Sequence, residues 1–216
     1  MPRRPRICFP GAVYHIYQRG NDKQDIFLDD FDRWHFLKLL LEAKKAFRYL
    51  IYCYVLMNNH FHMTVETPNE IPISKIMQFT EGSYATYFNK RHDRKGHLFE
   101  GRFNDIIVEK DSYLLQLSRY VHLNPVRAGL VALPEEYGWS SFCIYLGRRE
   151  DILVDTDIVL QYFDSSDLCG ARGKYKNFVE EKIASVSGKD DWLENNLVGK
   201  KFLGSSDFIR NFRKGV

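Results

Sequence analysis

The chain has 216 residues, 44% hydrophobic and 15% aromatic, which is enough to bury the core of one domain with a smaller annex. Its 31 basic and 28 acidic residues leave a formal net charge of +3, so the overall charge identifies no partner. No apolar run approaches the roughly 18 residues of a membrane helix, and the basic N-terminus has no hydrophobic signal core behind it, so we expect a cytoplasmic protein without a membrane partner. Four scattered cysteines without CxxC spacing predict reduced thiols.

The first third of the chain predicts a strand, a helix and two further strands. Residues 12–20 alternate and are rich in aromatic and β-branched side chains, which predicts a strand that ends at Gly20. Residues 29–47 open with acids, close with lysines and repeat apolar residues at helical spacing, which predicts a helix. Residues 50–57 and 60–67 predict two strands, arranged either as a hairpin or as one strand with a bulge.

The next elements continue the mixed pattern. Residues 73–91 predict a helix, residues 104–110 a strand, and residues 111–124 a helix that Pro125 stops. The order is then strand, helix, strand, strand, helix, strand, helix. This order predicts an α+β fold, with helices on one face of an antiparallel sheet, close to the ferredoxin-like or RNA-recognition topology.

The pattern of the sequence changes near residue 150, from longer predicted elements to short ones. Beyond that point the chain contains several short segments that resemble capped helices. We therefore expect two units, a main domain over 1–150 and a helical C-terminal subdomain over 151–216.

Basic residues gather at the N-terminus and in the segment 89–103, where phenylalanines accompany them. Cations that meet phosphates and rings that stack on unpaired bases suit a nucleic acid, although a solvated surface loop gives the same composition. The candidate phosphate contacts, which include two arginines further along the chain, are Arg3, Arg4, Arg6, Lys90, Arg91, Arg94, Lys95, Arg102, Arg119 and Arg127.

Two histidines stand one residue apart in the second predicted strand of the pair. Because side chains alternate between the faces of a strand, His60 and His62 project from the same face. Two adjacent imidazoles can chelate a divalent metal, but they can equally form hydrogen bonds at the edge of a core. The other candidate histidines, His92, His97 and His122, are expected in loops or at the surface.

The helix predicted over 111–124 carries a polar stripe beside an apolar one. At about 100° per residue the polar stripe contains Tyr113, Gln116, Tyr120 and Asn124, and the apolar stripe contains Leu114, Leu117 and Val121. Docking of the apolar stripe on the sheet would bring the hydroxyl of Tyr120 and the amide of Asn124 near the two imidazoles. The alternatives are a tyrosine half-buried at a sheet edge and an asparagine that caps the helix C-terminus.

Four segments of this chain resemble a known family in order and spacing. They are FPGAVYHIYQRGN, VLMNNHFHMTVETP, GHLFEGRF and RYVHLNPVRAGLV. This combination resembles the HUH single-tyrosine transposases, and among them the REP-associated tyrosine transposases. The resemblance extends over roughly residues 5–147.

The resemblance implies a set of roles for this chain. His60, His62 and Asn124 correspond to the ligands of Mg²⁺ or Mn²⁺, and Tyr120 corresponds to the nucleophile. The implied substrate is single-stranded or hairpin DNA from palindromic repeats, nicked and rejoined through a 5′-phosphotyrosine by a monomer or homodimer. Two alternatives are a noncatalytic DNA-binding or regulatory protein on the same fold, and a metal-dependent phosphodiester hydrolase that activates water.

Overall fold

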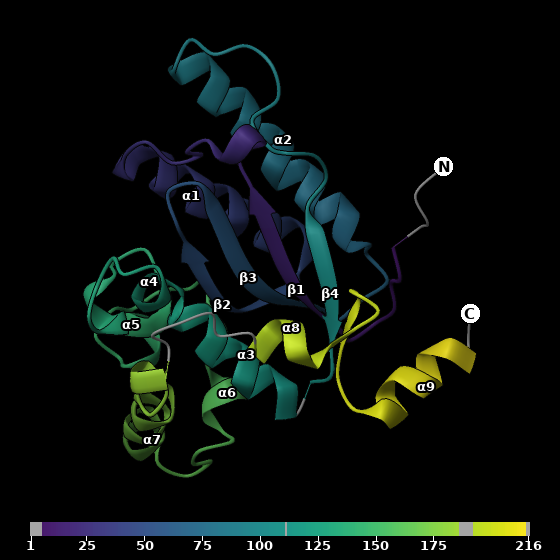
Figure 1. Cartoon of the computed structure of the whole chain (residues 1–216), viewed down its shortest axis with the longest axis vertical. Helices are drawn as coiled ribbons and strands as arrows, with labels where there is room; N and C mark the ends of the chain where they lie inside the picture. The colour runs from purple at the N-terminus through teal and green to yellow at the C-terminus, as the bar shows by residue number, and fades with distance from the viewer. Residues whose placement is uncertain (1–5, 111, 186–191, 215–216) are drawn as a thin grey trace.

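A computed structural model describes residues 6–110, 112–185 and 192–214 of the chain (Figure 1). Its elements, in chain order, are β1 Ala12–Arg19, η1 Asn21–Lys23, α1 Asp30–Phe47, β2 Leu50–Leu56, β3 His60–Thr67, α2 Ile73–Arg91, β4 Asn104–Val108, α3 Ser112–His122, α4 Asn124–Arg127, η2 Pro134–Glu136, α5 Phe142–Tyr145, α6 Asp157–Leu160, α7 Leu168–Glu180, η3 Ile183–Ser185, α8 Trp192–Asn196, β5 Leu197–Val198, β6 Phe202–Leu203 and α9 Ser206–Lys214.

The elements up to β4 lie close to their predicted bounds, and local chemistry explains their ends. The carboxylate of Asp29 accepts a hydrogen bond from Asp32 N and caps α1, and Arg48 ends that helix in a left-handed conformation. Strands β2 and β3 pair antiparallel, so the alternative of a hairpin is the correct one for these two segments.

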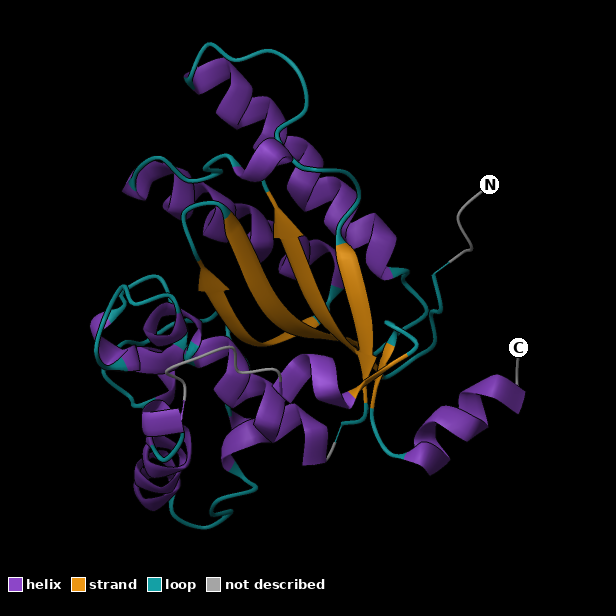
Figure 2. Cartoon of the chain, viewed as in Figure 1, coloured by secondary structure: helices purple, strands orange, loops and turns teal. Residues whose placement is uncertain are grey.

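The strands form one layer, shown in orange in Figure 2, in the order β2-β3-β1-β4-β6-β5. All pairs are antiparallel except β4 with β6. The predicted α+β class and the sheet are thus confirmed.

The helices, however, cover both faces of the sheet, whereas the sequence led us to expect one face. Phe61 of β3 packs against Phe36 of α1, with ring centroids 4.9 Å apart, and the next residue, His62, faces Tyr120 of α3. Adjacent residues of a strand point to opposite faces, so α1 and α3 lie on opposite sides. The physical reason is that both faces of β3 are buried and each needs its own apolar cover. In Figure 1, α1 and α2 lie at the upper part of the sheet and α3 and α8 at the lower part, with α7 at the lower left.

Helix α3 presents its apolar stripe to the sheet as predicted, and Leu114, Leu117 and Val121 are fully buried. It ends at His122, two residues before the predicted end. A second short helix, α4, begins at Asn124, and Pro125 lies in its first turn, where no backbone N–H is required. Asn124 therefore has helical backbone geometry, as the first residue of α4.

His122 is buried in the core, in contrast to the expected loop or surface position. Its Nδ1 lies 2.7 Å from the hydroxyl of Tyr175 on α7, and its Nε2 lies 2.8 Å from Ser141 Oγ. Burial lowers the pKa of His122 to about 3, so the ring is neutral and both nitrogens are hydrogen-bonded. The hydrogen bond between His122 and Tyr175 therefore joins α3 to α7.

The segment beyond residue 150 is not wholly helical, because β5 and β6 extend the main sheet beside β4. The backbone N–H groups of Ile107 and Glu109 donate to the carbonyls of Lys201 and Leu203, each at 2.8 Å. The division of the chain at residue 150 stays a prediction.

Two further expectations concern thiols and membranes. All four cysteines are free thiols, as predicted. Across the described ranges, no helix combines the length and the apolar character that a membrane crossing would need.

Candidate active site

The two histidines of β3 point to the same face of the sheet, as the alternation of the strand requires. Their ring centroids are 5.2 Å apart and the rings are perpendicular. His60 is half-buried, and its Nδ1 lies 2.6 Å from Asn59 Oδ1. An amide oxygen only accepts, so Nδ1 of His60 carries the proton and Nε2 keeps its lone pair. His60 is thus held in the tautomer that a metal ligand needs.

His62 is buried more deeply, within a layer of rings from β1. Tyr17 lies opposite His62 in the strand register, with ring centroids 5.8 Å apart. On its other side, His15 places Nε2 3.0 Å from His62 Nδ1. Burial holds the pKa of His62 well below its ordinary value, and burial also lowers the pKa of His60 to about 4. Both imidazoles are therefore neutral near pH 7, with lone pairs available to a cation.

Helix α3 brings Tyr120 to these rings. The centroid of its half-buried ring lies 6.0 Å from that of His62 and 6.1 Å from that of His15. The guanidinium carbon of Arg127, on α4, lies 4.4 Å from the centre of the Tyr120 ring. This contact places the guanidinium charge against the face of the phenol ring. The predicted nucleophile and one predicted ligand thus lie on one face of the sheet, with a cation beside the phenol.

Asn124 uses its amide nitrogen to cap α3. Nδ2 donates to the carbonyl of Tyr120 at 2.9 Å and to that of Val121 at 3.4 Å. The capping alternative raised from the sequence is therefore present. This cap leaves Oδ1 as the amide atom that can accept a hydrogen bond or bind a cation. Because Nδ2 is bonded to the carbonyl of Tyr120, the orientation of Oδ1 depends on the position of Tyr120.

The donor set fits a hard or borderline divalent cation. The set predicted from the sequence would supply one imidazole nitrogen each from His60 and His62, both with Nδ1 engaged elsewhere, and an amide oxygen from Asn124. Imidazole is accepted by Mn²⁺, and amide oxygen suits both Mn²⁺ and Mg²⁺. Within the described ranges no group of three His, Cys, Asp or Glu residues is arranged to hold a metal.

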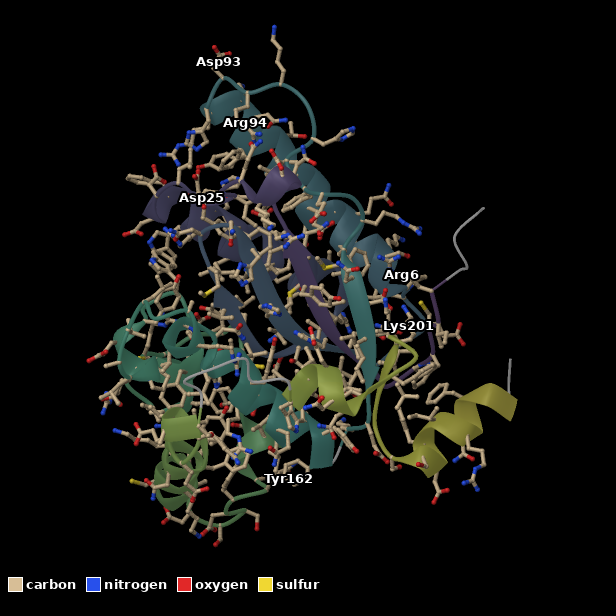
Figure 3. All side chains as sticks on the ribbon, viewed as in Figure 1. Arg6, Asp25, Asp93, Arg94, Tyr162 and Lys201 are labelled. Atoms are coloured by element: carbon tan, nitrogen blue, oxygen red, sulfur yellow. The ribbon has the colours of Figure 1, made fainter. Side chains whose placement is uncertain are left out.

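A cavity of 1710 Å³ opens beside His60 and runs along β1 and β4 to the C-terminal segment. Asp105 in its wall is matched by Arg6, at 3.1 Å, and by Lys201, and Glu100 is matched by Arg19, at 2.6 Å. Figure 3 shows Arg6 and Lys201 side by side next to β4. Three more exposed cations line the same cavity and form no ion pair with any described residue: Lys23, Arg102 and Lys200.

The aromatic residues in the wall include Tyr17, Phe9, Phe103 and Phe202. With its acids already paired, the cavity therefore presents excess positive charge and ring faces next to the histidine pair. These are the groups that bind phosphates and unpaired bases.

The predicted phosphate contacts divide into three groups. Arg3 and Arg4 lie outside the described residues. Arg6 pairs with Asp105, and Arg91 pairs with both Asp29 and Asp32. Arg119 donates to the carbonyl of Phe178 at 3.2 Å. Arg94 donates to Gln24, and Arg127 stacks on Tyr120. The remaining candidates are exposed: Lys90, Lys95 and Arg102. Of the eight candidates that the structure describes, Arg6 and Arg102 line the cavity.

Sequence reasoning overlooked several groups at this site. His15 and Tyr17 share a face of β1 by simple alternation, which is a visible signal, but their proximity to His62 depends on the strand order. Asn59 lies in the turn between β2 and β3, where the sequence alone does not reveal its contact with His60. Lys200 belongs to a segment without any periodic pattern, and nothing in the sequence links it to β1.

An α+β sheet with a histidine pair and a tyrosine on one face is the arrangement of the HUH single-tyrosine transposases. Residues 8–124 match the family model described as "Transposase IS200 like", and this chain belongs to that family of transposases. A search of curated proteins gave no match.

Two solved structures are similar to this chain. The first is a REP-associated tyrosine transposase bound to a REP hairpin, with a TM-score of 0.58 and 15% identity over 72% of this chain and 94% of that chain. The second is a transposase-like protein from Deinococcus radiodurans, with a TM-score of 0.40 and 12% identity over 56% of this chain and 95% of that chain.

Proposed function

We propose that this protein nicks and rejoins single-stranded or hairpin DNA through a covalent bond to Tyr120. The observation that carries the proposal is the position of Tyr120 on α3. Its ring centroid lies 6.0 Å from that of His62 on β3, and the ring of His60 lies next to that of His62. The solved relative bound to a REP hairpin supports DNA as the partner and palindromic repeats as the source of the substrate. The cytoplasm is the proposed location, and monomer or homodimer the proposed state.

The reaction is a transesterification in which the number of phosphodiester bonds is conserved. The Tyr120 oxygen loses its proton and attacks phosphorus, the bond from phosphorus to the 3′ oxygen breaks, and that oxygen takes up a proton. The products are a 5′-phosphotyrosine and a free 3′-hydroxyl, which can attack in turn and restore the strand. No ATP is needed because the covalent link stores the phosphodiester.

The side chains divide the work. Arg127 stabilises the phenolate of Tyr120 through its contact with the ring. His60, His62 and Asn124 would hold the metal. Mg²⁺ or Mn²⁺, when bound, neutralises charge that develops on the phosphate. The cations of the cavity, Lys23, Arg102 and Lys200, would position the DNA backbone that leads to the scissile phosphate.

The test mixes the purified protein with end-labelled oligonucleotides from palindromic repeats near its own gene, with Mn²⁺ or with EDTA. We expect an SDS-resistant protein–DNA band that needs the metal and disappears in Tyr120→Phe. Tyr113→Phe is the matched control, because Tyr113 lies on the same helix, and it should retain the band. Cleavage without an adduct in Tyr120→Phe would instead indicate a water-activating hydrolase, and binding without cleavage in any variant a noncatalytic DNA-binding protein.

A further inference from the structure

His15 is fully buried on β1, on the face of the sheet that carries the histidine pair. Its register partner is Thr64, and His62 lies diagonally across the two strands. The rings of His15 and His62 are stacked, with centroids 5.2 Å apart, planes within 20° and a nitrogen-to-nitrogen contact of 3.0 Å. In the described part of the chain, Nδ1 of His15 has no hydrogen-bond partner, so the polar function of this ring is directed entirely at His62.

We propose that His15 is a positioning residue, which accepts a hydrogen bond from His62 Nδ1–H and thereby presents the lone pair of His62 Nε2 to the metal. The inference rests on the proposed function, because it concerns the metal site of that function. Asn59 has the same role for His60, because its Oδ1 lies 2.6 Å from His60 Nδ1 and accepts the hydrogen bond there.

Asn59 and His15 differ in which tautomers they allow their partner histidines, His60 and His62, to adopt. A neutral imidazole carries one proton, and a ring that binds a metal through Nε2 has to carry it on Nδ1. Asn59 Oδ1 cannot donate, so it permits only this form of His60. His15 can accept or donate through Nε2, and the pair therefore has two arrangements of its protons. Only the arrangement in which His15 accepts leaves His62 able to bind a cation.

The chemistry of the burial also indicates a functional role. When His15 accepts through Nε2, its own proton sits on Nδ1, a buried nitrogen with no partner among the described residues. An unpaired buried polar group costs stability, and an apolar ring would fill the same space without that cost. A histidine is therefore a poor choice for the core here and a good choice for holding His62. Its ring also meets that of Tyr120 edge-on at 6.1 Å, so one residue contacts both the proposed ligand and the proposed nucleophile.

The test measures Mn²⁺ affinity by electron paramagnetic resonance, without DNA and without activity. His15→Phe keeps an aromatic ring in the same space but cannot accept, and we expect its affinity to fall by roughly 10-fold to 100-fold. His15→Gln offers an amide oxygen and should recover most of that loss. His97→Ala, which removes an exposed histidine of the loop after α2, is the control and should bind like the wild type. An unchanged affinity in His15→Phe would overturn the inference.

A second measurement on the wild type keeps the inference testable if His15→Phe does not fold. In ¹⁵N-labelled protein loaded with Mg²⁺, we expect a scalar coupling between His62 Nδ1 and His15 Nε2 across the hydrogen bond, with the proton on His62. A proton on His62 Nε2 would overturn it. The failure of the proposed function looks different: His60→Ala would then bind Mn²⁺ as tightly as the wild type. Weaker binding in His60→Ala with unchanged binding in His15→Phe would remove only the role of His15.

Discussion

Replacement of Tyr175 by phenylalanine should destabilise the protein by removing one hydroxyl at the contact of α7 with α3. The hydroxyl lies 2.7 Å from His122 Nδ1 and 3.1 Å from Ser118 Oγ, and the ring is fully buried against Tyr145. The Tyr175 hydroxyl donates to Ser118 Oγ, which itself donates to the carbonyl of Leu115. In the variant, His122 Nδ1 loses its hydroxyl partner and stays buried.

The magnitude follows from these contacts. A buried polar group left unsatisfied costs about 1–3 kcal/mol, and the lost hydrogen bond to Ser118 adds about 0.5–1.5 kcal/mol. Phenylalanine keeps the ring packing, so no cavity term is added. The sum is about 3 kcal/mol, which for a chain of this size lowers Tm by roughly 6–12 °C.

The assay is thermal unfolding followed by circular dichroism, with Tyr162→Phe as the matched control. Tyr162 lies just after α6 and is 43% exposed (Figure 3), so its change should stay within about 0.5 kcal/mol. A Tm of Tyr175→Phe within roughly 1 °C of the wild type would refute the reasoning.

Three further predictions concern an ion pair, a partly buried acid and the cavity. Asp32 is fully buried and paired with Arg91, so Asp32→Asn should lower the free energy of unfolding by about 3 kcal/mol, and urea unfolding with no change would contradict this. Burial raises the pKa of Glu81 from 4.5 to about 8, so the folded protein holds a proton that the unfolded chain releases. Stability should thus fall as pH rises from 4.5 to about 8, by up to about 1.4 kcal/mol per pH unit, and Glu81→Gln should flatten that slope in urea titrations at pH 5 and pH 8. Lys200→Gln should weaken DNA binding and reduce the salt slope by about 1 in anisotropy titrations, whereas Lys38→Gln, on α1, should leave both unchanged.

Local pattern predicted the parts of the fold that local forces decide. The bounds of α1 follow from an acidic cap and helical periodicity, and the shared face of His60 and His62 follows from the two-residue repeat of a strand. The apolar stripe of α3 predicted that this helix packs on the sheet and brings Tyr120 with it.

Contacts between distant segments could not be predicted in this way. The pairing of Arg91 with Asp29 joins residues 62 apart, and a basic loop looks the same in sequence whether or not its charges are compensated. The support of His62 by His15 depends on β1 lying beside β3, which periodicity does not specify. Strands β5 and β6 have two residues each, too few for any repeat to show.

The cavity beside His60 has an unusual origin in the chain, since its walls come from both ends. Residues 6–9 form one side, and residues 199–202 with Asn211 and Phe212 form another, whereas the histidine pair and Tyr120 are all in place by residue 124. During synthesis on the ribosome, the histidine pair and Tyr120 are therefore made before the C-terminal wall of the cavity. A nascent or prematurely ended chain would carry the reactive groups without the surface proposed to position the DNA.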